Sequence, residues 1–105
     1  MSSFFLLPPI LFELLAEFTE GKEIADYARD AMRRAAVERQ LEVIGEAMAQ
    51  LAKSDAPVAE GISEYRRIVA LRNILIHGYA DVDDRLVWDV VETKLPCFRE
   101  KSQYC

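Results

Sequence analysis

The fold is decided by residues 23–53, EIADYARDAMRRAAVERQLEVIGEAMAQLAK. Apolar residues recur through this stretch at helical spacing, and the positions between them hold Ala, Glu, Arg and Gln, which are strong helix formers. The apolar stripe consists of Ile24, Tyr27, Ala28, Ala31, Ala35, Leu41, Ile44, Met48 and Leu51. The pattern predicts one long central helix whose apolar face packs against other helices.

A shorter helix is predicted before this stretch. Pro8-Pro9 sets up a helix start, because proline is favoured in the first turn of a helix. The apolar residues that follow repeat at spacings of three and four before Gly21, namely Ile10, Leu11, Leu14, Leu15 and Phe18.

Two more helices are predicted on the C-terminal side. Residues 54–57 break the central helix, and a third helix begins at about residues 61–64 and ends near Gly78. Residues 81–84 supply N-cap carboxylates for a last helix, in which Pro96 is expected to be a kink or a stop. About four helices with short connections, and no competing strand pattern, predict an all-α antiparallel bundle that forms a single domain over residues 1–105.

Composition restricts the possible functions. The 105 residues are 51% hydrophobic and 30% charged, which predicts a soluble, folded domain whose small core would benefit from a second subunit. The net charge of −5 argues against broad DNA binding, since non-specific affinity for a polyanion comes from Lys and Arg. A local basic site is still compatible with this charge, because six arginines cluster in the sequence: Arg33, Arg34, Arg39, Arg66, Arg67 and Arg72.

The sequence predicts neither a membrane segment nor a metal or cofactor site. The apolar opening, Phe4 to Phe12, is too short to span a bilayer, and no Lys or Arg precedes it as in a signal peptide. We expect it to pack on the core or on a partner, in a cytoplasmic protein. A disulfide between Cys97 and Cys105 would restrain little, and two thiols with one distant His make a poor zinc site.

Polar residues within the third helix are the anomaly that points to function. The end of this helix reads Arg72-Asn73-Ile74-Leu75-Ile76-His77-Gly78-Tyr79. Arg72 lies on the edge of the helix that Tyr65, Val69 and Ile76 define, where a bundle would favour leucine, so its charge needs a partner or a ligand. In the simplest case Arg72 pairs with Glu42 or Glu46, and His77 is a helix cap or a hydrogen-bonded core residue.

A composite site would need two chains. Arg72 and His77 are five residues apart, so their side chains diverge by about 140° around the helix axis. Two copies of the helix that meet across a two-fold axis could line one cleft with both residues from each chain. This geometry predicts a homodimer whose axis passes near the third helix.

Residues 72–79 resemble the Arg-x4-His-x-Tyr signature of HepT toxins, the HEPN-domain partners of minimal nucleotidyltransferases. Two more segments occur in the family's order. Arg39–Ala47 resembles its long-helix segment, and Val87–Val91 followed by Leu95-Pro96 resembles its last helix. The resemblance covers about residues 35–98.

The resemblance implies a metal-independent endoribonuclease toxin of a type VII-like toxin–antitoxin pair, with RNA as its substrate. His77 would exchange protons with the 2′-hydroxyl or the leaving oxygen, Arg72 would hold the phosphate, and Asn73 would orient or support them. The resemblance also implies that a cognate nucleotidyltransferase antitoxin neutralises the toxin by adenylylation of Tyr79. The apolar N-terminus and the short 54–61 connection depart from the family, and they concern substrate access rather than the site.

Two other interpretations remain open. The same dimer could be a non-catalytic binding partner or target of the transferase, which the negative charge favours. It could also be a structural dimer without a ligand, which would leave Arg72 and His77 without a purpose.

Overall fold

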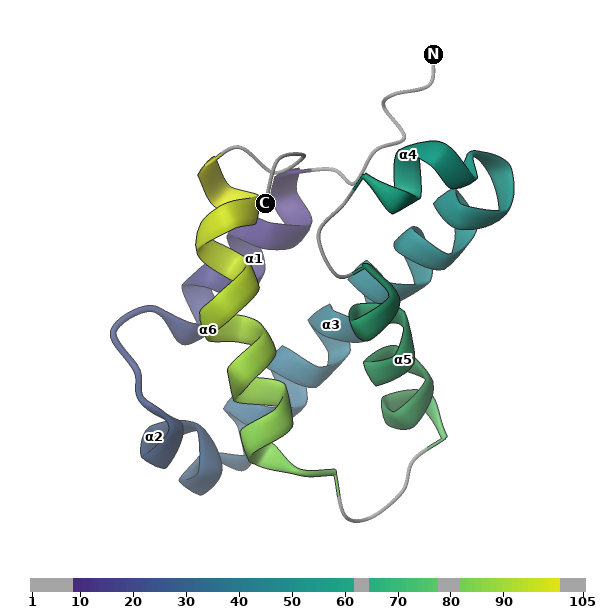
Figure 1. The fold of residues 1–105 in the computed structure, drawn as a ribbon. Coiled ribbons are helices and arrows are strands. Elements are labelled where there is room, and N and C mark those ends of the chain that lie inside the picture. Colours follow the sequence, from purple (N-terminus) through teal and green to yellow (C-terminus); the bar gives the residue numbers. More distant parts are fainter. Residues whose placement is uncertain (1–8, 62–64, 78–81, 101–105) are drawn as a thin grey trace.

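The computed structural model describes residues 9–61, 65–77 and 82–100, and every regular element in these ranges is a helix (Figure 1). The helices are α1 (Pro9–Thr19), α2 (Ile24–Arg29), α3 (Ala31–Ser54), α4 (Ala56–Glu60), α5 (Tyr65–Ile76) and α6 (Asp84–Glu100). The chain reverses direction between successive long helices α1, α3, α5 and α6 (Figure 1). The predicted all-α antiparallel bundle is therefore confirmed, and two short helices are added to the four that were expected.

The centre of the bundle is α3. It packs most extensively against α5 and also contacts α1, α2 and α4, while α6 packs against α1 and α2. The buried apolar residues of α3 are Val37, Leu41, Ile44, Met48 and Leu51. The predicted stripe included four of these residues and missed Val37, which is fully buried. The predicted central helix is therefore correct from Ala31 onward, and its predicted apolar stripe matches the buried face from Leu41 onward.

The prediction of one continuous helix over residues 23–53 is wrong, because Asp30 divides this stretch into α2 and α3. Asp30 is extended (φ −111°, ψ 97°) between α2 and α3, and its carboxylate accepts a hydrogen bond from the Arg33 backbone N–H at 3.1 Å. An aspartate that caps the following helix competes with continuation of the preceding one. Three alanines of the predicted stripe, on either side of this break, are exposed: Ala28, Ala31 and Ala35.

The predicted break after the central helix contains α4. Asp55 caps this helix by accepting a hydrogen bond from the Val58 backbone N–H at 3.4 Å. Pro57 lies in the first turn, where its missing N–H would have no partner within the helix. Ala59 is fully buried and attaches α4 to the core. The residues that break the central helix thus start a new one.

The ends of α5 and α6 differ in part from the prediction. The Asp83 carboxylate accepts a hydrogen bond from the Arg85 backbone N–H at 2.9 Å, as an N-cap of α6 should. Pro96 does not stop α6, which continues to Glu100. Proline removes one helical hydrogen bond, and the backbone of α6 nevertheless remains helical on both sides of Pro96. Gly78, the predicted end of the third helix, lies outside the described residues.

The N-terminal apolar segment is described only from Pro9 onward. Phe12 is buried in the core, as expected for the end of this segment. Gln40 donates a hydrogen bond from Nε2 to the Leu11 carbonyl oxygen at 3.1 Å, which ties α1 to α3. Within the described ranges, no helix is long and apolar enough to cross a membrane.

The aromatic pair Tyr27–Trp88 holds α2 against α6. The two ring centroids are 5.1 Å apart at an interplanar angle of 33°, and Trp88 donates a hydrogen bond from Nε1 to Glu92 at 3.0 Å. Tyr27 is fully buried, and its hydroxyl has no hydrogen-bond partner among the described residues. Burial, and to a smaller extent the carboxylates of Glu38 and Asp84, raise the pKa of Tyr27, so this phenol stays neutral.

The closest approach of α3 to α5 is at Gly45. A Cβ atom placed on Gly45 would lie 2.4 Å from Cβ of Arg72 and 3.3 Å from the Ile68 carbonyl oxygen. Carbon atoms cannot approach to 2.4 Å without bonding, so only glycine allows this contact. Glycine within a helix costs about 1 kcal/mol relative to alanine, so this position trades helix propensity for close packing.

Gly45→Ala should lower the free energy of unfolding by about 1–3 kcal/mol, although alanine is the better helix former. The new methyl group must push α5 and the Arg72 stem away from α3. Urea denaturation measures this change. Gly61→Ala is the control, because its Cβ would meet only the Val58 carbonyl oxygen at 3.3 Å and the Pro57 carbonyl oxygen at 3.9 Å. Equal stability of Gly45→Ala and wild type would refute the close contact.

Candidate functional site

Arg72 lies at the edge of the contact between α3 and α5. Its stem packs over Gly45, and only 18% of its side chain is exposed. Its guanidinium donates from Nη2 to a carboxylate oxygen of Glu46 and from Nη1 to Oδ1 of Asn73. Of the two carboxylates predicted as partners, the structure pairs Arg72 with Glu46, whereas Glu42 pairs with Arg39 at 3.3 Å.

Glu46 is itself held on α3. Gln50, one turn further along the helix, donates a hydrogen bond from Nε2 to Glu46 at 2.9 Å. Hydrogen bonds from Gln50 and from Arg72 lower the pKa of Glu46 below its usual value, so this group is a carboxylate at neutral pH. A line of polar contacts therefore runs from Gln50 through Glu46 and Arg72 to Asn73.

His77 lies at the end of α5. Its backbone N–H donates to the Asn73 carbonyl oxygen at 3.3 Å, which extends the helical pattern by one residue. The side chain of His77 is exposed, and so are those of Ile74 and Ile76, at 37% and 51%. Arg72 and Asn73 are thus joined within one chain, and His77 follows on the same helix at an accessible position.

One predicted site residue, Tyr79, is not described, and one residue of the cluster, Gly45, was not predicted. Tyr79 lies outside the described residues. Gly45 was not predicted as part of the site, although a glycine among strong helix formers was the available signal. Its role depends on α5, which is far away in the sequence, so helical periodicity could not show it.

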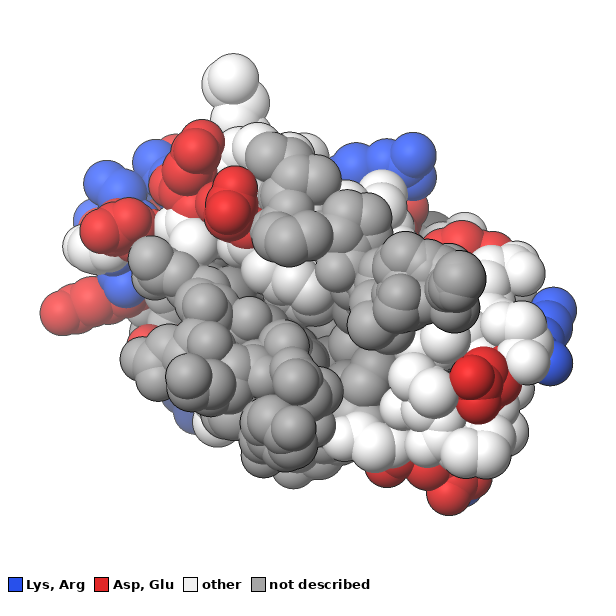
Figure 2. Space-filling view, turned by 90° about the horizontal axis from the view of Figure 1, so that it is seen from above, with Lys and Arg blue, Asp and Glu red and all other residues white. Residues whose placement is uncertain are grey.

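Most arginines of the predicted basic cluster are paired with carboxylates. The pairs are Arg33–Asp30, Arg39–Glu42, Arg66–Glu60, Arg67–Asp89 and Arg72–Glu46. On the face that Figure 2 shows, the described basic and acidic side chains are mixed around the periphery. Any attraction of RNA would therefore be local rather than spread over a broad basic surface.

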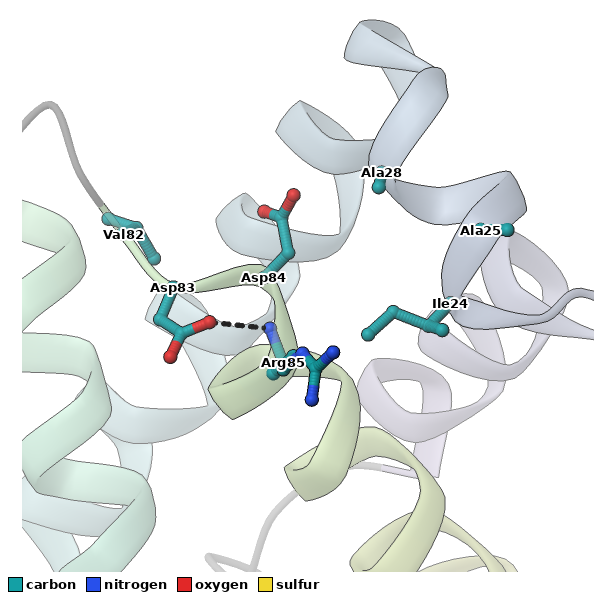
Figure 3. Close-up of a pocket in the computed structure, with 7 residues that line it drawn as sticks. All are labelled: Ile24, Ala25, Ala28, Val82, Asp83, Asp84 and Arg85. Carbon is teal, nitrogen blue, oxygen red and sulfur yellow. Dashed lines mark hydrogen bonds between the residues drawn. The ribbon is translucent and has the colours of Figure 1, made fainter.

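A pocket of about 640 Å³ lies between α2 and the start of α6 (Figure 3). Its lining consists of Ile24, Ala25, Ala28, Val82, Asp83, Asp84 and Arg85, and it includes none of the predicted site residues. One of its carboxylates, that of Asp83, is already engaged by the Arg85 backbone N–H. Among the described side chains, no group of three or more His, Cys, Asp and Glu residues could hold a metal ion. The candidate site is therefore the cluster at the edge of α3 and α5.

The all-α bundle, in which α5 packs on the long central helix α3, is of the HEPN class. The family match is more particular. Residues 11–105 match the family described as Ribonuclease HepT-like, so the chain belongs to the HepT-like ribonuclease family.

Relatives of similar length support this assignment. The chain is 34% identical over 91 residues to a probable ribonuclease HepT of Thermococcus cleftensis, covering 87% of this chain and 82% of that protein. It is 33% identical over 87 residues to a protein of Methanocaldococcus jannaschii named as a candidate RNase, covering 83% of this chain and 79% of that one. No solved structure gives a significant match.

Proposed function

We propose that this protein is a metal-independent endoribonuclease that acts as the toxin of a type VII-like toxin–antitoxin pair. The observation that carries the proposal is the placement of Arg72, whose guanidinium is held at the edge of the bundle, with His77 accessible on the same helix. Membership of a family whose members are named as ribonucleases supports the same class of reaction.

The proposed reaction is transfer of a phosphodiester within RNA. The 2′-oxygen attacks phosphorus, the bond to the 5′-oxygen breaks, and one proton moves from the 2′-hydroxyl to the leaving oxygen. An imidazole both accepts and donates protons near neutral pH, so His77 would take part in this transfer. Arg72 would bind the phosphate oxygens, because a guanidinium stays charged and matches them bidentately. Asn73, which accepts a hydrogen bond from Arg72, would support its orientation.

The proposed active form is a homodimer. Arg72 and His77 diverge by about 140° around α5, so one helix does not direct both at one phosphate. A second copy of α5 across a two-fold axis would supply the missing partner and cover Ile74 and Ile76, which are exposed beside His77. Apolar side chains grouped next to a polar site are typical of surfaces that a partner covers.

Light scattering at micromolar concentration should give the mass of a dimer, and Ile76→Glu should shift it toward the monomer and lower RNA cleavage in parallel. A buried charge at an interface costs several kcal/mol unless it is paired. Val58→Glu is the matched control, because Val58 is also exposed, at 41%, but lies on α4. A stable wild-type monomer would exclude the composite site.

Purified protein should cleave single-stranded RNA in the presence of EDTA. Arg72→Ala and His77→Ala should each lower kcat/KM by about 100-fold or more, because each removes a group that acts in the transition state. Arg39→Ala, which removes an exposed arginine of α3 paired with Glu42, should leave the rate nearly unchanged. Loss of cleavage in EDTA, or full activity of His77→Ala, would require a different catalyst.

The proposed regulator is a cognate nucleotidyltransferase that adenylylates Tyr79. A phosphodiester two residues after His77 would add negative charge that can pair with Arg72 and exclude RNA from the same position. Coexpression with the transferase should therefore add one adenylyl group to the intact mass and abolish cleavage. Tyr79→Phe should keep its unmodified mass and remain active.

The same experiment tests the alternative function. If the transferase adenylylates the wild-type protein, but the unmodified protein does not cleave RNA, the protein would be a non-catalytic target of the transferase. The net charge of −5 and the pairing of Arg72 with Glu46 are the observations that favour this alternative. An identical adduct on Tyr79→Phe would show that another residue is the acceptor.

A further inference from the structure

We infer that Glu46 is a positioning residue, which together with Gly45 and Asn73 fixes the plane of the Arg72 guanidinium before RNA binds. This inference rests on the proposed function, because it concerns the group that would hold the phosphate. It assigns to α3 a direct part in a site whose other residues all lie on or just after α5.

The stem of the Arg72 side chain is held against α3. Arginine has a long, flexible side chain, and holding it in one conformation costs up to about 2 kcal/mol of side-chain entropy. Here, Cβ and Cγ of Arg72 lie only 2.4 and 2.9 Å from the position that a Cβ on Gly45 would take. The first carbons of the stem therefore rest directly on the backbone of α3, which restricts their freedom.

The guanidinium of Arg72 is held by two acceptors. The two terminal nitrogens donate to acceptors on different helices, Nη2 to Glu46 on α3 and Nη1 to Asn73 on α5. A planar group held at two separate nitrogens cannot rotate about its long axis without breaking a hydrogen bond. Gln50, which hydrogen-bonds the Glu46 carboxylate at 2.9 Å, keeps one of these acceptors in place.

The guanidinium of Arg72 keeps N–H donors for a phosphate. A guanidinium has five N–H donors, and Glu46 and Asn73 use one each. As far as the described residues are concerned, three donors are left for a phosphate, which needs two for a bidentate contact. Glu46 can therefore orient Arg72 without occupying the positions that the phosphate requires.

Glu46 would affect kcat and KM in different ways. The Glu46 charge beside Arg72 weakens ground-state attraction for any phosphate, so Glu46 does not improve RNA binding. A fixed donor is most effective where charge develops in the transition state. A positioning role therefore belongs to kcat, whereas a purely masking role would appear as a higher KM in the wild type than in a Glu46 variant.

Glu46→Ala should lower kcat for single-stranded RNA by about 10–100-fold and leave KM within about threefold of wild type. Glu46→Gln should recover much of this loss, since the amide oxygen still accepts a hydrogen bond. The matched control is Glu42→Ala, which removes the same charge one turn earlier on α3, where it pairs with Arg39. Unchanged kcat in Glu46→Ala, or a rise in kcat/KM, would overturn the inference.

A measurement without RNA separates this inference from the proposed function. In ¹⁵N spectra, the two terminal NH₂ groups of a fixed guanidinium give distinct signals, and free rotation averages them. We expect distinct Arg72 signals in the wild type and in Glu42→Ala, and averaged signals in Glu46→Ala, with a thermal melt to confirm that each variant is folded. Distinct Arg72 signals without any cleavage by the wild type would refute the ribonuclease but not the positioning by Glu46. Averaged Arg72 signals in an active wild type would refute the positioning alone.

Discussion

The close contact between the α3 backbone at Gly45 and the stem of Arg72 is the constraint on which the bundle and its candidate site both depend. It sets how near α5 can come to α3, the most extensive helix pair in the molecule. At this separation three residues of α5 are buried, namely Ile68, Leu71 and Leu75. The same separation brings the Arg72 guanidinium to Glu46. The separation of α3 and α5 therefore determines both the packing of the core and the position of the Arg72 guanidinium.

A charged residue at the rim of a core is tolerated because its two ends have different environments. The apolar stem of Arg72 lies between the helices, and its guanidinium reaches acceptors at the edge. Because 49% of the Glu46 side chain is exposed, solvent screens the pair, and the pair adds little to the stability of the fold. An interaction with so little energy is better explained by the geometry that it imposes on the guanidinium than by the stability that it adds.

Sequence periodicity predicted the fold class and the anomaly at Arg72, because both depend on residues close together along one helix. It failed where a residue had two compatible roles. Asp30 fits within a helix but caps the next one, and residues 54–57 break the central helix as predicted but also begin α4, which was not predicted. Local pattern also could not choose between Glu42 and Glu46 as the partner of Arg72. That choice depends on how α5 lies on α3, where the stem of Arg72 packs over Gly45, next to Glu46.

The acidic composition and the proposed action on RNA can be reconciled through the same ion pairs. Arginines paired with carboxylates attract a polyanion weakly at long range, so this protein would bind RNA non-specifically with low affinity. The rate of cleavage would then depend on a few donors that are already oriented when negative charge develops in the transition state. Preorganisation of Arg72 would be more important in a protein with a net charge of −5 than in a basic nuclease, because the overall charge does not compensate for a poorly placed guanidinium. The close contact at Gly45 restricts the stem of Arg72. Under the proposed function, this one oriented arginine would take the place of the many arginines with which a basic nuclease attracts RNA.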